Sequence, residues 1–225
     1  FGANRVVTAP ATAAPVLTTS AGTSAYIENQ SAIVVDAGLL ASDADSINLV
    51  GATVAISVNY ASGQDVLAFT NQLGITGSWN AATGVLTLSG TTSVANYQTA
   101  LRTVSYFNSS DDPSTLARTI SFVANDGATP STAATRIVSV AAVNDVPVVV
   151  TSGSALAYTE NQAATAIDTG LAVSDIDNTS LTGAIVSISA NYASGQDVLA
   201  FTNLLGITGS WNAGTGVLTL SGTTS

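Results

Sequence analysis

The sequence contains no lysine, histidine, cysteine or methionine, and its only cationic side chains are four arginines. Without cysteine there is no disulfide framework and no thiolate metal site, and without histidine the usual zinc and copper ligands are missing. The common general bases and several catalytic nucleophiles are absent as well. A glycosidase needs only two carboxylates, but the repeated acids fall at a predicted domain boundary. We therefore predict that the protein is not an enzyme.

The acidic side chains outnumber the basic ones, 14 to 4, and the formal net charge is −10. Nucleic-acid binding needs a basic surface, and anionic membranes attract basic segments, so neither partner is expected. No apolar run reaches the ~20 residues that a membrane-spanning helix requires, so we predict no membrane insertion in this segment. The acidity itself has two interpretations, a solvated surface or the binding of metal ions.

The chain repeats itself with an offset of 132 residues. Asn59–Ser93 matches Asn191–Ser225 at 33 of 35 positions, with no insertion or deletion. Such tandem copies are normally selected for length, spacing or multivalency. The second copy lacks counterparts of Val94–Val143, so we expect a truncated module or one completed by another chain. The predicted boundaries are a first segment at 1–15, a first module at 16–143, a linker at 144–147 and a second module at 148–225.

Short apolar, β-branched and threonine-rich runs alternate with clusters of Gly, Asn, Asp and Ser, which is typical of an all-β sandwich. We predict tandem Greek-key β-sandwiches, the second incomplete. Val94, Tyr97 and Leu101 recur at helical spacing and predict one short helix at Val94–Leu101. The predicted strands are Val16–Thr19, Ala32–Asp36, Ala52–Val58, Gly74–Trp79, Val85–Ser89, Thr103–Asn108, Arg118–Asn125 and Thr135–Val143.

Five acidic residues recur at the same offset, in the pairs Glu28/Glu160, Asp36/Asp168, Asp43/Asp175, Asp45/Asp177 and Asp65/Asp197. Alternate residues of an extended segment point the same way, so Asp43 and Asp45 present two carboxylates to one ion. Close carboxylates repel each other unless a cation neutralises them. Calcium accepts six to eight oxygen ligands of this kind. The pattern therefore predicts calcium sites, and the alternative is that these residues form turns and caps.

Glu28, the pair Asp43 and Asp45, and the linker Val143-Asn-Asp-Val-Pro147 resemble the calcium motifs of cadherin-like domains. Together with Ser105–Asn108 and Phe122–Gly127, they resemble the tandem cadherin-like repeats of large bacterial surface and secreted adhesins. The resemblance covers essentially the whole chain. It implies an extracellular location on a bacterial surface and Ca²⁺ bound at the junctions between modules.

The resemblance also implies ligands at three junctions. Those of the complete junction are Glu28, Asp126, Asn144, Asp145, Asp175 and Asp177. Asp43 and Asp45 would serve the preceding junction, and Glu160 the following one. The chain departs from the family because its linker is less acidic, and the linker before the first module, Ala11–Pro15, has no acid at all. We therefore expect one or two ions at the complete junction.

The predicted function is that of an extracellular structural or adhesive repeat protein, a calcium-stiffened spacer or fibre module whose partners are neighbouring repeats or copies of itself. One alternative is a subunit of a self-assembling filament completed by strand exchange, in which Arg5–Thr8 is the donor. Another is a polysaccharide-binding module that uses Trp79 and Trp211, although packing at the sandwich edge also explains both. Asp65 and Asp197 are interpreted as loop residues, with metal binding as the alternative.

Overall fold

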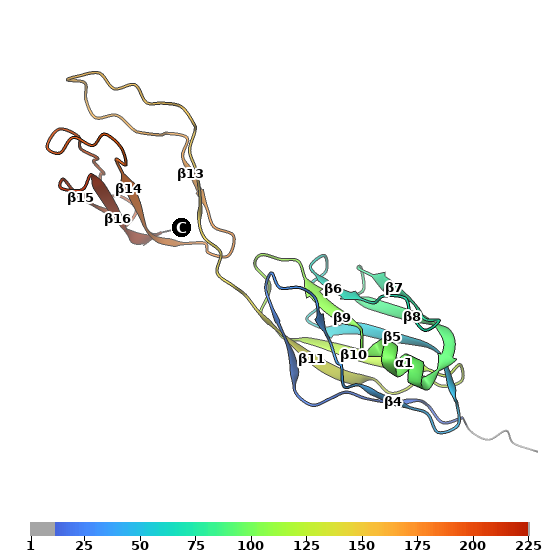
Figure 1. Ribbon diagram of the computed structural model, residues 1–225. Coiled ribbons are helices and arrows are strands. Elements are labelled where there is room, and N and C mark those ends of the chain that lie inside the picture. The colour runs from blue at the N-terminus through green and yellow to red at the C-terminus, as the bar shows by residue number, and fades with distance from the viewer. Residues whose placement is uncertain (1–11, 225) are drawn as a thin grey trace, which may run out of the picture. The chain divides into compact units, whose positions relative to one another are not determined.

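The computed structural model describes residues 12–224 and separates the chain into two compact units, Phe1–Val143 and Asn144–Ser225. The division falls at the start of the predicted linker. β-strands are the main regular secondary structure of both units (Figure 1), so the predicted all-β class is confirmed. The predicted donor strand Arg5–Thr8 lies outside the described residues. In the described part of the chain, no helix has the length and apolar character to cross a membrane.

The larger layer of the first unit is a six-stranded sheet with the order β2-β11-β10-β5-β8-β7. Its strands are β2 (Thr23–Ile27), β5 (Asn48–Val58), β7 (Thr76–Asn80), β8 (Val85–Ser93), β10 (Arg118–Asn125) and β11 (Ala134–Ala141). All neighbours are antiparallel except β2 and β11, which run parallel. Buried and partly exposed residues alternate along β10, which shows that one face of the sheet points into the core.

The opposite layer consists of two smaller sheets, with the orders β1-β4 and β3-β9-β6. Their strands are β1 (Val16–Thr18), β3 (Ile33–Val34), β4 (Leu40–Ser42), β6 (Asp65–Ala68) and β9 (Ser105–Asn108). Leu17 and Tyr106 of this layer share one hydrophobic core with Val54 and Phe122 of the larger sheet. The chain crosses between the layers several times, and the result is a β-sandwich.

The predicted helix is confirmed as α1 (Val94–Leu101). The Ser93 hydroxyl caps its first turn by accepting a hydrogen bond of 3.2 Å from the Asn96 N–H. Tyr97, Ala100 and Leu101 form its buried face. Strands β2, β4 and β6 were not predicted. They are short, lack a run of β-branched residues, and pair with strands distant in the sequence, so local pattern carries little signal for them.

The second unit repeats part of this architecture. Its strands are β12 (Val148–Val150), β13 (Ala172–Ser174), β14 (Leu181–Ser187), β15 (Thr208–Asn212) and β16 (Val217–Thr224), which correspond to β1, β4, β5, β7 and β8. The counterparts of β2, β3 and β6 are not strands. In the first unit those three strands pair with β9 and β11, whose counterparts would lie outside the 225 residues.

Apolar side chains that are buried in the first unit are exposed at the equivalent positions of the second unit. Tyr26 is 1% exposed in the first unit, whereas its counterpart Tyr158 is 61% exposed. Likewise Leu17 is 8% exposed and its counterpart Val149 is 59% exposed. Among the described residues of the second unit, Leu218 is the one buried large hydrophobic residue, and it is 6% exposed. The core of this unit is therefore open on one side.

Asp65 is not the loop residue that its sequence context indicates. It is the first residue of β6, and its side chain and that of Arg118 are both fully buried in a salt bridge of 3.1 Å. Tyr106 and Asn108 donate hydrogen bonds to its other oxygen, at 2.5 and 2.7 Å. Burial raises the pKa of Tyr106, and the hydrogen bond to Asp65 raises it further. This network joins β6 and β9 of one layer to β10 of the other.

Replacing Asp65 with asparagine should destabilise the first unit by about 3–5 kcal/mol, because the Arg118 guanidinium would be left buried without its counter-ion. Urea unfolding of the full chain measures the loss. The matched control is Asp197→Asn at the equivalent, partly exposed position of the second unit, which should change little. A double variant, Asp65→Leu with Arg118→Met, should recover most of the stability. Equal losses in the single and double variants would contradict this account.

Candidate metal centre

Asp43 closes a turn directly after β4. One of its oxygens accepts hydrogen bonds from the backbone N–H groups of Asp45, at 3.1 Å, and Ser46, at 2.9 Å. This geometry is an Asx turn, for which aspartate is well suited. Asp45, two residues on, accepts a hydrogen bond of 2.9 Å from the backbone N–H of Ala13. The turn therefore holds two carboxylates at the end of the sandwich where the chain enters the first module.

Asp126 lies in the turn that follows β10. One of its carboxylate oxygens accepts hydrogen bonds from the backbone N–H groups of Thr129, at 2.8 Å, and Ala128, at 2.7 Å. These two hydrogen bonds hold the pKa of Asp126 below its usual range. The side chain is consequently a carboxylate at neutral pH, and one of its oxygens stays available for a further ligand.

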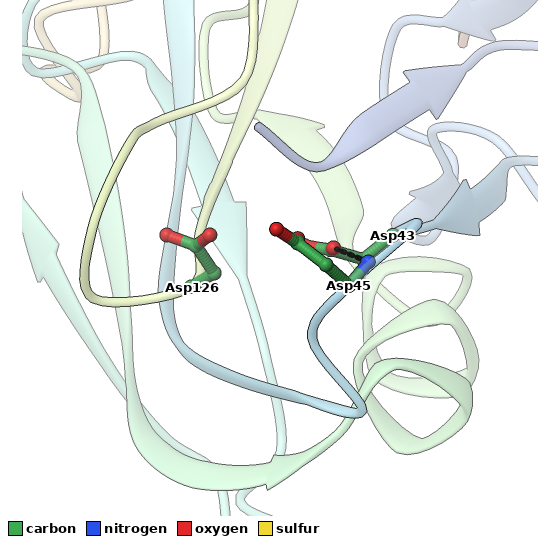
Figure 2. A group of neighbouring side chains, drawn as sticks. All are labelled: Asp43, Asp45 and Asp126. Atoms are coloured by element: carbon green, nitrogen blue, oxygen red, sulfur yellow. Dashed lines mark hydrogen bonds between the residues drawn. The ribbon is translucent and has the colours of Figure 1, made fainter. Parts of the chain in front are cut away.

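The structure brings Asp43, Asp45 and Asp126 together, with one oxygen of each within 4.8 Å of the others. Figure 2 shows the carboxylates of Asp43 and Asp45 side by side and directed toward Asp126. The Oδ2 atoms of Asp43 and Asp126 are inaccessible to solvent and have no hydrogen-bond partner. Oxygens at this separation fit around a calcium ion, whose ligands lie about 2.3–2.6 Å away. The donor set therefore fits Ca²⁺.

None of the described arginines neutralises this cluster. Arg118 pairs with the buried Asp65. The Nε of Arg102 donates to the Leu39 carbonyl, and Arg136 donates to carbonyls at Ser20 and Ala21. Since the chain has no lysine and no histidine, the three carboxylates gather without a cationic side chain among residues 12–224.

The position of Asp126 corrects one part of the predicted ligand set. The sequence pattern assigned Asp126 to the junction with Glu28, Asn144 and Asp145, but the structure places it beside Asp43 and Asp45. The reason is strand direction. Strands β10 and β11 are antiparallel, so the turn after β10 lies at the opposite end of the sheet from Ala141, where β11 runs toward the linker.

The second unit contains the corresponding turn. Asp175 accepts hydrogen bonds from the backbone N–H groups of Asp177, at 3.3 Å, and Asn178, at 3.0 Å. Asp177 accepts a hydrogen bond of 3.0 Å from the N–H of Asp145, just as Asp45 accepts one from the N–H of Ala13 in the first module. The Asn178 amide also donates to the side-chain oxygen of Asn144, at 3.0 Å. The structure therefore brings four of the predicted ligands together within this unit.

The pKa of Asp177 lies below its usual range, chiefly because of a side-chain hydrogen bond with Asp175 and also because of the N–H of Asp145. Asp145 adds a carboxylate where the first module has Ala13, and Asn178 adds an amide where it has Ser46. Within residues 12–224, however, the three acidic residues whose oxygens lie within 4.8 Å of one another are those of the first module. The second module therefore offers more oxygen ligands at its turn, whereas the carboxylate oxygens of the first module lie closer together.

Glu28 lies at the other end of the first module. It is 4% exposed, and its Oε2 accepts a hydrogen bond of 2.7 Å from the backbone N–H of Val143, the last residue of that unit. Its role as a metal ligand stays a prediction. Glu160, its counterpart, is exposed. The following residues, Asn29 and Asn161, adopt the left-handed backbone conformation with φ of 62° and 64°, which explains why asparagine recurs in both turns.

Asp36 and Asp168 have a different role, although they recur at the same offset. Asp36 accepts hydrogen bonds from the N–H and hydroxyl of Ser20 and from the N–H of Gly38. Burial alone would raise the pKa of Asp36. These hydrogen bonds and the charge of Arg136 lower it by more, so the pKa lies below the usual range. Asp168 likewise accepts hydrogen bonds from the N–H groups of Ser152 and Gly170. Both residues stabilise turns.

The tryptophans pack at the sandwich edge, as one of the two interpretations predicts. Trp79 meets Tyr60 edge-to-face, with ring centroids 6.1 Å apart, and lies against the hydrophobic core. Trp211 repeats the contact with Tyr192, at 6.0 Å. The hairpin of each unit is thus held by an aromatic pair.

Comparison with known proteins shows one informative similarity. A segment of the chain is 41% identical over 100 residues to halomucin from Haloquadratum walsbyi. The match covers 42% of this chain and 1% of halomucin. No protein-family model and no solved structure matches the chain. The chain therefore resembles a small part of a very long protein, and its resemblance to cadherin-like repeats stays a prediction.

Neutralising one carboxylate of the cluster should have opposite effects with and without calcium. In a chelator, Asp126→Asn should raise the melting temperature of the first unit, because it removes like-charge repulsion while the hydrogen bonds to Ala128 and Thr129 remain. In calcium it should lower the melting temperature relative to wild type. Differential scanning calorimetry of the full chain measures both. The control is Asp111→Asn, in an exposed turn. If the two variants changed the melting temperature equally in calcium and in chelator, the cluster would not be a calcium site.

Proposed function

We propose that the chain is part of a long extracellular surface protein, in which tandem β-sandwich modules serve as spacers. The exact 132-residue register of the repeat supports this function, because regular modules set length and spacing. Similarity to a short stretch of halomucin supports the same context, since that name denotes a mucin. The net charge of −10 favours solubility of such an array through mutual repulsion.

We further propose that Ca²⁺ binds at the acidic turns and stiffens the protein. The observation that carries this proposal is the convergence of Asp43, Asp45 and Asp126, with two buried carboxylate oxygens that have no partner. A divalent cation would neutralise the repulsion among these side chains and supply the missing interaction. In the second unit, Asp145, Asp175 and Asp177 would act in the same way.

The contacts of the linker explain how binding would limit its flexibility. The backbone N–H of Val143 is held by Glu28 within the first unit. Two residues later, the N–H of Asp145 is held by Asp177 within the second unit. Only Asn144 separates the two anchored residues, and its side chain accepts a hydrogen bond from Asn178. An ion bound by Asp145 and Asp177 would strengthen one of these anchors directly.

Calcium should stabilise the chain and restrict the linker. For a Kd of about 1 mM, typical of extracellular modules, roughly 10 mM calcium would add about 1.4 kcal/mol. Calorimetry measures this gain, and small-angle scattering measures the distribution of distances within the full chain, which should narrow. Magnesium chloride at equal ionic strength is the control and should do neither. A chain whose stability and scattering are the same in calcium and in chelator would rule out the proposal.

Exchanging the residues at positions 13 and 145 should exchange the affinities of the two sites. Asp145→Ala removes a carboxylate and should weaken the second site by about tenfold, whereas Ala13→Asp should strengthen the first. Each substitution preserves the backbone N–H that contacts Asp177 or Asp45. Isothermal titration calorimetry with calcium measures both changes. If neither variant alters binding, the linker residue is not a ligand.

A further inference from the structure

Three short segments of the chain have an asparagine followed, two residues later, by a serine, with a residue other than proline between them. They are Asn29-Gln-Ser31, Asn108-Ser-Ser110 and Asn178-Thr-Ser180. In a protein that is exported from the cell, this pattern is the acceptor motif for N-linked glycans. A glycan is bulky and hydrated, so the folded chain accepts it only where the asparagine amide is on the surface and is not needed for an internal contact. The structure separates the three motifs by this criterion.

The first motif lies in the exposed connection between β2 and β3. Its asparagine, Asn29, is exposed and occupies a turn in which the backbone N–H of Gln30 donates to the Ile27 carbonyl at 3.2 Å. The Asn29 amide makes one long hydrogen bond of 3.4 Å, to the Glu28 side chain. Ser31 is exposed as well, and no hydrogen bond within residues 12–224 uses its hydroxyl. Both groups that define the motif are therefore accessible.

The second motif is buried in the core of the first unit. Asn108 is 2% exposed, and its amide donates a hydrogen bond of 2.7 Å to Asp65. Its side-chain oxygen accepts one of 2.9 Å from the backbone N–H of Ser110. A sugar attached to this nitrogen would enter the network around the buried ion pair and separate the two layers. Asn108 therefore has a structural role that a glycan would prevent.

The third motif is exposed, but the amide of its asparagine is occupied. The Asn178 amide donates two hydrogen bonds, one of 3.0 Å to the Asn144 side chain and one of 2.9 Å to Asp177. A side-chain amide has only two hydrogens to donate. A glycosidic bond replaces one of them, so it would break a contact of the acidic turn in the second unit. This leaves Asn29 as the acceptor that the folded chain presents.

The repeat provides an internal comparison for this motif. Asn161, the counterpart of Asn29, lies in the same kind of turn, with φ of 64° against 62° and a hydrogen bond of 3.1 Å from the N–H of Gln162 to the Thr159 carbonyl. The residue two positions later is Ala163 in place of Ser31. The left-handed turn thus accounts for asparagine in both copies. It does not account for Ser31, whose hydroxyl completes the motif in one copy alone.

We propose that Asn29 is the attachment site of an N-linked glycan, an inference that rests on the proposed extracellular location. The donor would be an oligosaccharide carried on a polyprenyl diphosphate, and the catalyst an oligosaccharyltransferase of the export pathway. The Asn29 Nδ2 forms a bond to the anomeric carbon of the sugar, while the bond from that carbon to the diphosphate oxygen breaks. The lipid diphosphate leaves with the bonding electrons, and one amide proton passes to a base of the transferase. The Ser31 hydroxyl is the group that the transferase recognises.

The test uses the purified, folded chain with an oligosaccharyltransferase that reads the three-residue motif and its polyprenyl-diphosphate-linked oligosaccharide. Cleavage after the arginines places Asn29 in fragment 6–102, Asn108 in 103–118 and Asn178 in 137–225. Mass spectrometry should find one oligosaccharide, on fragment 6–102. An unmodified fragment 6–102, or modification of the other two fragments instead, would overturn the proposal.

Matched variants test the motif in its turn. Ser31→Ala and Asn29→Gln should each abolish the modification of fragment 6–102, whereas Ser31→Thr should retain it. Ala163→Ser creates the motif at the equivalent turn of the second unit and should add an oligosaccharide to fragment 137–225, at Asn161. Modification that persists in Ser31→Ala, or a second turn that stays unmodified in Ala163→Ser, would contradict the assignment.

The native protein distinguishes a failure of this inference from a failure of the proposed function. Protein recovered from the cell exterior with a glycan on Asn29 would support both. Protein recovered there with Asn29 unmodified would overturn the glycosylation site and leave the proposed function intact. Protein confined to the cell interior would overturn the proposed location and, with it, the glycosylation site.

Discussion

The first module depends on the buried ion pair between Asp65 and Arg118. It joins the two layers of the sandwich, because Asp65 begins β6 in one layer and Arg118 begins β10 in the other. Tyr106 and Asn108 of β9 complete the network through the same carboxylate. A buried charge is tolerable only when its partner is in place. The pairing therefore requires β6, β9 and β10 to assemble together, and residues 53 positions apart in the chain must meet.

The second unit differs from the first in these contacts. Its Asp197 accepts the hydrogen bond from Ala193 that corresponds to the one from Ala61 to Asp65. It has no counterpart of Arg118 among the 225 residues. The local elements, the β15–β16 hairpin and its Tyr192–Trp211 contact, form as in the first unit. The elements that need β9 or β11 do not. Near-identical sequence thus gives identical hairpins but a different degree of burial.

The acidic turns follow a similar division between local and distant causes. The turn at Asp43 and its copy at Asp175 are fixed by hydrogen bonds to the next few backbone N–H groups. The arrival of Asp126 beside Asp43 depends on the direction of β10 and on its pairing with β5 and β11. Strand direction relative to the module ends is not visible in a single sequence. For this reason the acidic pairs were predictable from the sequence, whereas the end of the module at which each residue lies was not.

The sequence by itself determined the repeat period, the all-β class, the helix at Val94–Leu101 and the acidic turns, because these follow from periodicity, turn chemistry and composition within a few residues. Only the tertiary structure decided the burial of Asp65, the place of Asp126 and the existence of strands as short as β4 and β6. Each of these depends on contacts between residues far apart in the chain. Such contacts exist only once both layers enclose a common core.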